Sequence, residues 1–167
     1  MKKTHKIISV LLVLAMMLTM APISAFAVVS PSTVEIGGIT YYKIRNAVEL
    51  DWFASQVNSG NGSINAALAN DIVYNSGTMS ASTTGASVWT PIGSRENPFT
   101  GIFNGQGYTI SGLYSKDPDE NPYLALFACT VDATVANVAV KNFYFESTYR
   151  LCAGLVSYSA GTTIYNC

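Results

Sequence analysis

Ala125-Leu-Phe-Ala128 with Thr134-Val-Ala-Asn137, and then Gly154-Leu-Val-Ser157 with Thr163-Ile-Tyr-Asn166, are two copies of one pattern. Both parts of the pattern recur at the same spacing, so that Val135 in the first copy corresponds to Ile164 in the second. A period of about 20–50 residues indicates stacked structural units. Because each unit contains short β-rich runs and no helical periodicity, the repeat predicts stacked β-strands.

Earlier parts of the chain resemble this unit at a shorter spacing. Thr109-Ile-Ser-Gly-Leu113 aligns with Thr134-Val-Ala-Asn-Val138, and Gly101-Ile-Phe103 aligns with Ala125-Leu-Phe127 after a shift of one residue. This alignment predicts an inward column of three apolar side chains, one from each unit: Ile110, Val135 and Ile164.

The same alignment places Gly112, Asn137 and Asn166 at one position. Glycine and asparagine are the residues that tolerate left-handed backbone geometry, so we expect a corner there in each unit. A chain that turns the same corner in every unit is a parallel β-helix, or β-solenoid, and the expected fold class is all-β. One such coil cannot bury enough apolar surface to fold alone, which explains why it is repeated.

Residues 28–90 are expected to form a hairpin, helix and loop cap ahead of β-helix coils at 91–167. Thr33–Ile36 and Ile39–Ile44 flank the turn Gly37-Gly38, which is typical of a hairpin. Asn46 with Glu49 predicts a capping box that begins a helix over 47–58. The apolar residues of this helix share one face and are expected to cover an end of the β core: Leu50, Phe53, Ala54 and Val57.

Residues 1–27 have the layout of a cleaved signal peptide. Lys2, Lys3 and Lys6 precede an apolar run over 7–20, and Ala25-Phe-Ala27 follows as a small-x-small cleavage site. The run is shorter than the ~20 apolar residues that a membrane-spanning helix needs. We therefore expect cleavage after Ala27, export, and no membrane segment in the mature chain.

Composition excludes several classes of function. The net charge is -1, which gives no basic surface for nucleic acid. The single histidine, His5, is removed with the signal peptide, so no imidazole remains for a Ser-His-Asp or Cys-His site or for an HExxH zinc site. A pair of carboxylates is the catalytic option that remains. We assign no catalytic, cofactor-binding or metal residues and predict a protein that is not an enzyme.

One cluster of acids has part of the pattern of a cation site. Asp117, Asp119 and Asn121 have the spacing of the first half of a calcium loop, but Pro122 stands at the glycine position and Ala128 at the final glutamate position. A solvated turn between two strands is the favoured interpretation, and a calcium site completed by other loops is the alternative.

Cys129, Cys152 and Cys167 are an odd number of cysteines for an exported chain. One disulfide with a free thiol is one arrangement open to such a chain. Burial as small apolar residues is favoured, because Cys167 shares its repeat position with Val138 and Leu113.

Several of these motifs resemble the GLUG-motif repeats of bacterial surface proteins, which also occur beside IgA-specific metalloendopeptidases. The resemblance covers about residues 41–167 and rests on the motifs at 89–93, 98–113, 154–156 and 163–167. It implies a right-handed β-helix and a surface location. Ala125 and Ala128 stand where the family usually has glycine, and the zinc-peptidase motif is absent, so no catalytic residues carry over.

The expected function is a secreted or cell-surface, non-catalytic β-helix module that serves as a stalk or adhesin associated with the cell wall. Host glycans, matrix proteins or further domains of the same chain are the expected partners. The alternative is the leading, non-catalytic part of a larger exported enzyme, either a polysaccharide-degrading β-helix or a metallopeptidase with these repeats. Since Cys167 falls within a repeat, we expect a longer protein.

Overall fold

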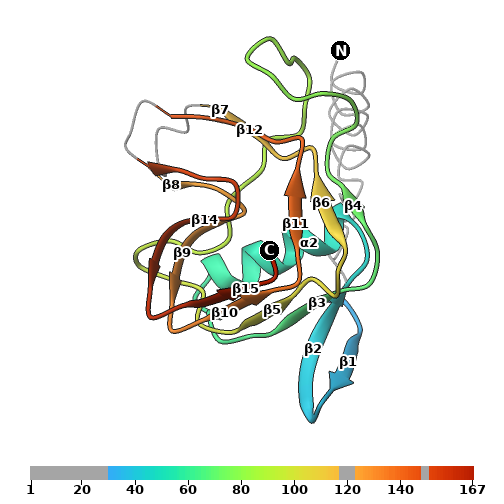
Figure 1. The fold of residues 1–167 in the computed structure, drawn as a ribbon, viewed down its shortest axis with the longest axis vertical. Coiled ribbons are helices and arrows are strands. Elements are labelled where there is room, and N and C mark those ends of the chain that lie inside the picture. The colour runs from blue at the N-terminus through green and yellow to red at the C-terminus, as the bar shows by residue number, and fades with distance from the viewer. Residues whose placement is uncertain (1–29, 117–122, 148–150) are drawn as a thin grey trace, which may run out of the picture.

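The computed structural model describes residues 30–116, 123–147 and 151–167 (Figure 1). The expected signal peptide at 1–27 and the acidic cluster at 117–122 lie outside these residues. The described chain is rich in β-strands, its sheets are mainly parallel, and it contains one helix.

The chain begins with the predicted hairpin. β1 (Thr33–Ile36) pairs antiparallel with β2 (Ile39–Ile44), with Ile36 opposite Ile39. Gly37 and Gly38 have φ angles of 60° and 80°, as a two-residue hairpin turn requires.

Helix α2 (Ala47–Asn58) follows with the predicted bounds and cap. The Oδ1 atom of Asn46 accepts a hydrogen bond from the backbone N–H of Glu49 at 3.0 Å. The return bond differs from the predicted capping box, because the Glu49 carboxylate accepts from the N–H of Arg45 at 2.7 Å rather than from that of Asn46. Glu49 also forms an ion pair with the Arg45 side chain, which keeps the Glu49 carboxylate next to Arg45 rather than next to Asn46.

The remaining strands pair in parallel with strands from earlier or later parts of the chain. The largest sheet has the order β1-β2-β3-β5-β10-β15, where β3 is Ala66–Leu68, β5 is Ile102–Asn104, β10 is Thr134–Ala136 and β15 is Thr163–Tyr165. A second sheet joins β4 (Ile72–Val73), β6 (Thr109–Ser111) and β11 (Ala139–Lys141). Figure 1 shows β5, β10 and β15 side by side.

Three smaller sheets are each formed by two strands. They pair β7 (Tyr114–Lys116) with β12 (Tyr144–Glu146), β8 (Tyr123–Leu124) with β13 (Leu151–Cys152), and β9 (Phe127–Val131) with β14 (Val156–Ala160). Isolated bridges also join Ile92 to Phe127 and Phe99 to Thr130.

The strand register confirms the repeat that relates Val135 to Ile164. These two residues lie opposite each other, and Phe127 lies opposite Val156. Asp132 and Gly161, which the repeat aligns, both have positive φ angles, of 48° and 63°. The sequence therefore predicted correctly which residues of the last two repeats are neighbours.

The alignment of residues 109–113 with 134–138 is wrong. Thr134 pairs with Ile102, and Thr109 pairs with Ala139, so β6 and β10 belong to different sheets. The alignment of 101–103 with 125–127 is wrong for the same reason, because Phe103 lies opposite Val135. The turn between β5 and β6, at 105–108, is longer than the turn between β10 and β11, at 137–138, which shifts the spacing.

The predicted left-handed corners are present but form two sets. Gly112, Asn137 and Asn166 have φ angles of 77°, 57° and 52°. Asn137 and Asn166 occupy one corner, while Gly112 shares another with Asn142, whose φ angle is 49°. A glycine or asparagine with a positive φ angle fits the sequence pattern at either corner. The sequence alone therefore did not distinguish the two corners.

Side-chain amide hydrogen bonds connect the ends of three neighbouring strands, β5, β10 and β15, at the corner that contains Asn137 and Asn166. The Nδ2 atom of Asn166 donates to Oδ1 of Asn137 at 2.8 Å, and Nδ2 of Asn137 donates to Oδ1 of Asn104 at 3.0 Å. We call Asn104, Asn137 and Asn166 the asparagine ladder. Each of these bonds joins residues at the ends of two neighbouring strands. The side chains therefore add to the backbone hydrogen bonds that connect these strands.

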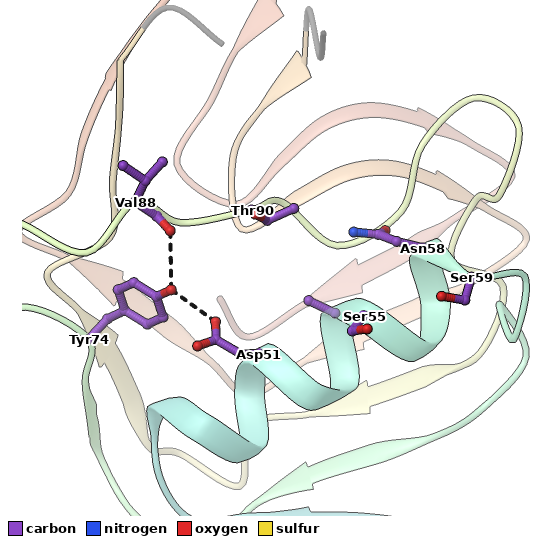
Figure 2. A pocket seen from close by; sticks show the side chains of 8 residues that line it. Asp51, Ser55, Asn58, Ser59, Tyr74, Val88 and Thr90 are labelled. Carbon is purple, nitrogen blue, oxygen red and sulfur yellow. Dashed lines mark hydrogen bonds between the residues drawn. The ribbon is translucent and has the colours of Figure 1, made fainter. Parts of the chain in front are cut away.

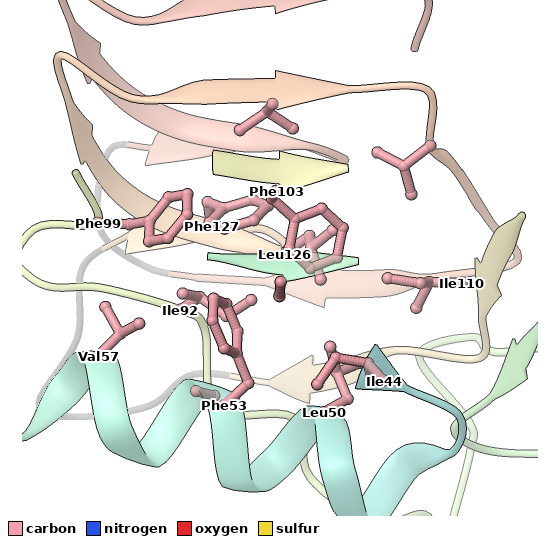
Figure 3. Packing of buried hydrophobic residues seen from close by; sticks show 14 of the residues in the cluster. Ile44, Leu50, Phe53, Val57, Ile92, Phe99, Phe103, Ile110, Leu126 and Phe127 are labelled. Atoms are coloured by element: carbon pink, nitrogen blue, oxygen red, sulfur yellow. The ribbon is translucent and has the colours of Figure 1, made fainter. Parts of the chain in front are cut away.

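The core lies between these strands and α2 (Figure 3). Phe53 of the helix packs against Phe99 and Phe103, with ring centroids 5.8 and 6.0 Å apart. Leu50, Phe53, Ala54 and Val57 are all buried, as predicted. The expected column is wrong for Ile110, which is buried in the core but pairs with Ile72 and Val140 rather than with Val135.

Burial of the cysteines differs from the prediction. Cys129 is buried, whereas Cys152 and Cys167 are exposed, and all three are free thiols. Cys167 is exposed because no described strand pairs with β15 on the side away from β10. The same open edge leaves Ile164 44% exposed, although its partner Val135 is fully buried.

We expect the asparagine ladder to contribute measurably to stability. N137G retains access to positive φ but removes both amide bonds, so its free energy of unfolding should fall by about 1–2 kcal/mol. N137A should lose about 1–2 kcal/mol more, because alanine adopts left-handed geometry poorly. Urea denaturation measures both values, and an N137G protein as stable as the wild type would show that the ladder bonds contribute nothing.

A pair of glycine variants tests how closely the backbone at Asn75 approaches the corner at Gly112. Gly107 and Gly112 both have positive φ angles, but a Cβ atom at Gly107 meets nothing within 4 Å, whereas one at Gly112 lies 2.0 Å from the Asn75 backbone oxygen. G112A should therefore be less stable than G107A by about 1–3 kcal/mol, from overpacking alone. Equal losses in thermal or urea unfolding would contradict this close approach.

Candidate functional site

The described structure has a groove along the exposed side of α2 (Figure 2). One hollow of about 480 Å³ lies between the helix and the segment at 88–90. An adjoining hollow of about 440 Å³ shares Asp51 and Ser55 with it. We call the two together the α2 groove, and its lining residues are Val48, Asp51, Trp52, Ala54, Ser55, Gln56, Asn58, Ser59, Tyr74, Val88 and Thr90.

The helix supplies most of this lining because of its periodicity. Asp51, Ser55 and the C-cap residue Ser59 follow one another at intervals of four, and Asn58 lies three residues after Ser55, so they share one face. The apolar face of the same helix is buried in the core, so the polar face is fixed toward solvent. The position of the groove thus follows from the burial of the helix.

Asp51 and Tyr74 form the central contact of the groove. The Tyr74 hydroxyl lies 2.9 Å from Oδ1 of Asp51 and 3.3 Å from the carbonyl oxygen of Val88 (Figure 2). The Tyr74 ring also packs edge-on against Trp89, with centroids 5.3 Å apart. Trp89 is itself anchored by a hydrogen bond from Nε1 to the Ala125 carbonyl, so the tyrosine is held by the core.

The pKa values of both groups are raised. Partial burial raises the pKa of Tyr74, and the hydrogen bond and negative charge of Asp51 raise it further. Partial burial also raises the pKa of Asp51, although the Tyr74 hydroxyl opposes this by hydrogen bonding to the ionised form. Tyr74 is therefore a neutral hydrogen-bonding partner of the carboxylate near neutral pH.

Asn58 has a structural role at the end of the groove. Its Oδ1 atom accepts from the N–H of Gly93 at 2.7 Å, and its Nδ2 atom donates to the Pro91 carbonyl at 3.0 Å. Asn97 in turn donates to the Asn58 carbonyl at 2.9 Å. These bonds fix the segment that forms the opposite wall.

The groove residues suit binding better than acid–base catalysis. Asp51 is the one charged residue in the lining, and general acid–base hydrolysis of a glycoside uses two carboxyl groups. Among the described residues, no group of three or more His, Cys, Asp or Glu side chains could hold a metal ion. Hydrogen bonding and contact with an aromatic ring are what this lining offers.

No site residues were predicted from the sequence, so Asp51, Trp52, Ser55 and Tyr74 were missed. The signal that could have found the helical members is the polar face of the predicted helix, opposite the apolar stripe. Tyr74 could not have been placed there, because it comes from a separate segment after β4.

Comparison of the chain with protein-family models, curated proteins and solved structures finds no match. Across 30–116, 123–147 and 151–167, no helix is long and apolar enough to cross a membrane.

The raised pKa of Asp51 predicts how an amide variant behaves with pH. Since the folded protein binds this proton more tightly than the unfolded chain, Asp51 makes the wild type less stable as pH rises from below its ordinary pKa of 3.8 through the raised value. D51N lacks this loss, so its free energy of unfolding relative to the wild type should increase over that interval and then level off.

Y74F provides the matched comparison. Removing its hydroxyl removes the bond that lowers the pKa of Asp51, so the interval in which stability falls should extend to higher pH. Urea unfolding at a series of pH values measures both effects. A difference between D51N and wild type that is constant or shrinks with rising pH would contradict the assignment.

Proposed function

We propose that the chain is a non-catalytic module of a secreted or cell-surface bacterial protein, built as a right-handed parallel β-helix with α2 as its N-terminal cap. The observation that carries the proposal is the in-register parallel stacking of β5, β10 and β15, joined by the asparagine ladder. Repeats that contact only their neighbours form an elongated structure along one axis, and such a shape is suited to a stalk.

The handedness is supported by the first crossover. β2 and β3 are parallel neighbours, and the chain passes from one to the other through α2. Connections of this kind between parallel strands are right-handed in about 98% of cases. The apolar face of α2 then covers Phe99 and Phe103, as a cap over the open end of a β core does.

Export is supported by the sequence of residues 1–27, with its basic start, apolar run and Ala25-Phe-Ala27. The likeness of residues 98–113 to GLUG-motif repeats supports a surface location, associated with the cell wall. The α2 groove, with its single carboxylate, supports an adhesin over a simple spacer, and host glycans or matrix proteins are the partners that an adhesin would contact.

A second candidate is the non-catalytic leading part of a larger exported enzyme. The observation that favours it is the exposed edge of β15, where Ile164 and Tyr165 are 44% and 53% exposed. Exposed apolar strand edges of this kind are usually paired or covered in soluble proteins, and a domain of such an enzyme is one of the structures that would cover this edge.

Expression in a bacterial host with a general secretion pathway tests the export step. The exported protein should have the mass of a chain that begins at Val28, because the small residues at 25 and 27 fit signal peptidase. A27L should prevent cleavage, whereas V28L, a matched change just past the site, should not. An uncleaved wild-type chain that stays in the cytoplasm would contradict the proposal.

A further inference from the structure

We propose that the α2 groove binds a neutral saccharide, with Asp51 as its main hydrogen-bonding group and Trp52 as its stacking surface. This inference rests on the proposed role as an exported surface module and names the ligand class of its binding site. The two adjoining hollows of the α2 groove have volumes of about 480 and 440 Å³, which fall within the usual range for ligand sites, about 300–1,000 Å³.

The polar lining matches the chemistry of sugar hydroxyls. A sugar hydroxyl both donates and accepts hydrogen bonds, and so do the hydroxyls of Ser55, Ser59 and Thr90, which line the same hollow as Asp51. A carboxylate accepts bonds from two neighbouring hydroxyls, and charge-assisted bonds of this kind are the stronger ones. Tyr74 holds the carboxylate in place through its contact with Oδ1.

Trp52 supplies the apolar element that a sugar ring requires. The tryptophan is partly exposed and lines the second hollow beside Asp51. Its ring packs edge-on against Tyr42, with centroids 4.8 Å apart at an interplanar angle of 60°. A ring held in this way loses little freedom on binding and offers a flat surface for the C–H face of a sugar.

The charge of the groove selects among saccharides. Asp51 is the one charged residue in the lining, and its carboxylate would repel a sialylated, sulfated or uronic acid sugar. The nearest hydrogen-bonding partner of this carboxylate is the neutral Tyr74, which does not compensate the charge. The groove therefore favours neutral over acidic glycans.

Tryptophan fluorescence of the full chain gives a local readout. The sequence has two tryptophans, and Trp89 is buried with its Nε1 hydrogen-bonded to Ala125, so a fluorescence change on adding ligand that W52F lacks is assigned to Trp52. The probes are neutral hexasaccharides of glucose, xylose, mannose, galactose and N-acetylglucosamine, together with lacto-N-tetraose. Sialyllactose is the acidic probe, and calorimetry provides a second measurement of affinity.

We expect saturable binding of at least one neutral probe and none of sialyllactose. D51A and S55Y should weaken binding by about tenfold or more, the first by removing the carboxylate and the second by filling the groove. E35Q, which changes an exposed carboxylate on the hairpin, is the matched control and should bind as the wild type does. W52F should retain part of the affinity, and W52A should lose it.

Three results would overturn the inference: no binding of any neutral probe at millimolar concentration, stronger binding of sialyllactose, or unchanged affinity in both D51A and S55Y. Circular dichroism of each variant separates loss of binding from loss of folding, and Ser55 is exposed, so S55Y should fold. If the chain is exported and cleaved but binds no saccharide, the inferred binding site is wrong and the proposed role as a stalk stands. If the chain is not exported, the proposed surface role itself is wrong.

Discussion

Parallel pairing between repeats is the constraint on which the rest of this structure depends. Strands as short as β5, β10 and β15 bury too little to persist alone, and each gains its backbone partners from the repeat beside it. Left-handed residues make this possible, because they return the chain to the same register in each repeat. The asparagine ladder adds side-chain bonds where that return occurs.

The core and the groove follow from the same constraint. Phe99 and Phe103, which come from the segment around β5, pack against Phe53 of helix α2 in the core. A helix that buries one face must present the other, and here the presented face carries Asp51 and Ser55. The same contacts that bury one face of α2 therefore position the carboxylate against Tyr74, so the proposed binding surface is a consequence of how the helix packs.

Local patterns predicted the elements well, and they predicted the relations between distant elements less well. The Gly37-Gly38 turn, the Asn46 cap and the pairing of Val135 with Ile164 could be predicted from the sequence because each depends on neighbouring residues or on a repeat of constant spacing. The pairing of Ile110 could not be predicted in this way. β6 and β10 have the same Thr-aliphatic pattern before a left-handed residue, and the longer turn at 105–108 changes the spacing between the strands of one repeat and those of the next. The exposure of Cys167 depends on what covers β15, and the groove depends on Tyr74, which packing brings to the helix from another segment.

Long-range proton contacts in a solution NMR spectrum test the central claim most directly. In-register parallel stacking predicts backbone nuclear Overhauser effects between neighbours of Val135 and Ile164, and between neighbours of Ile110 and Val140. The spacing of these contacts should follow the pattern of parallel strands, in which the hydrogen bonds are evenly spaced and slanted. Antiparallel contacts between these strands, or contacts that join Ile110 to Val135, would contradict the account.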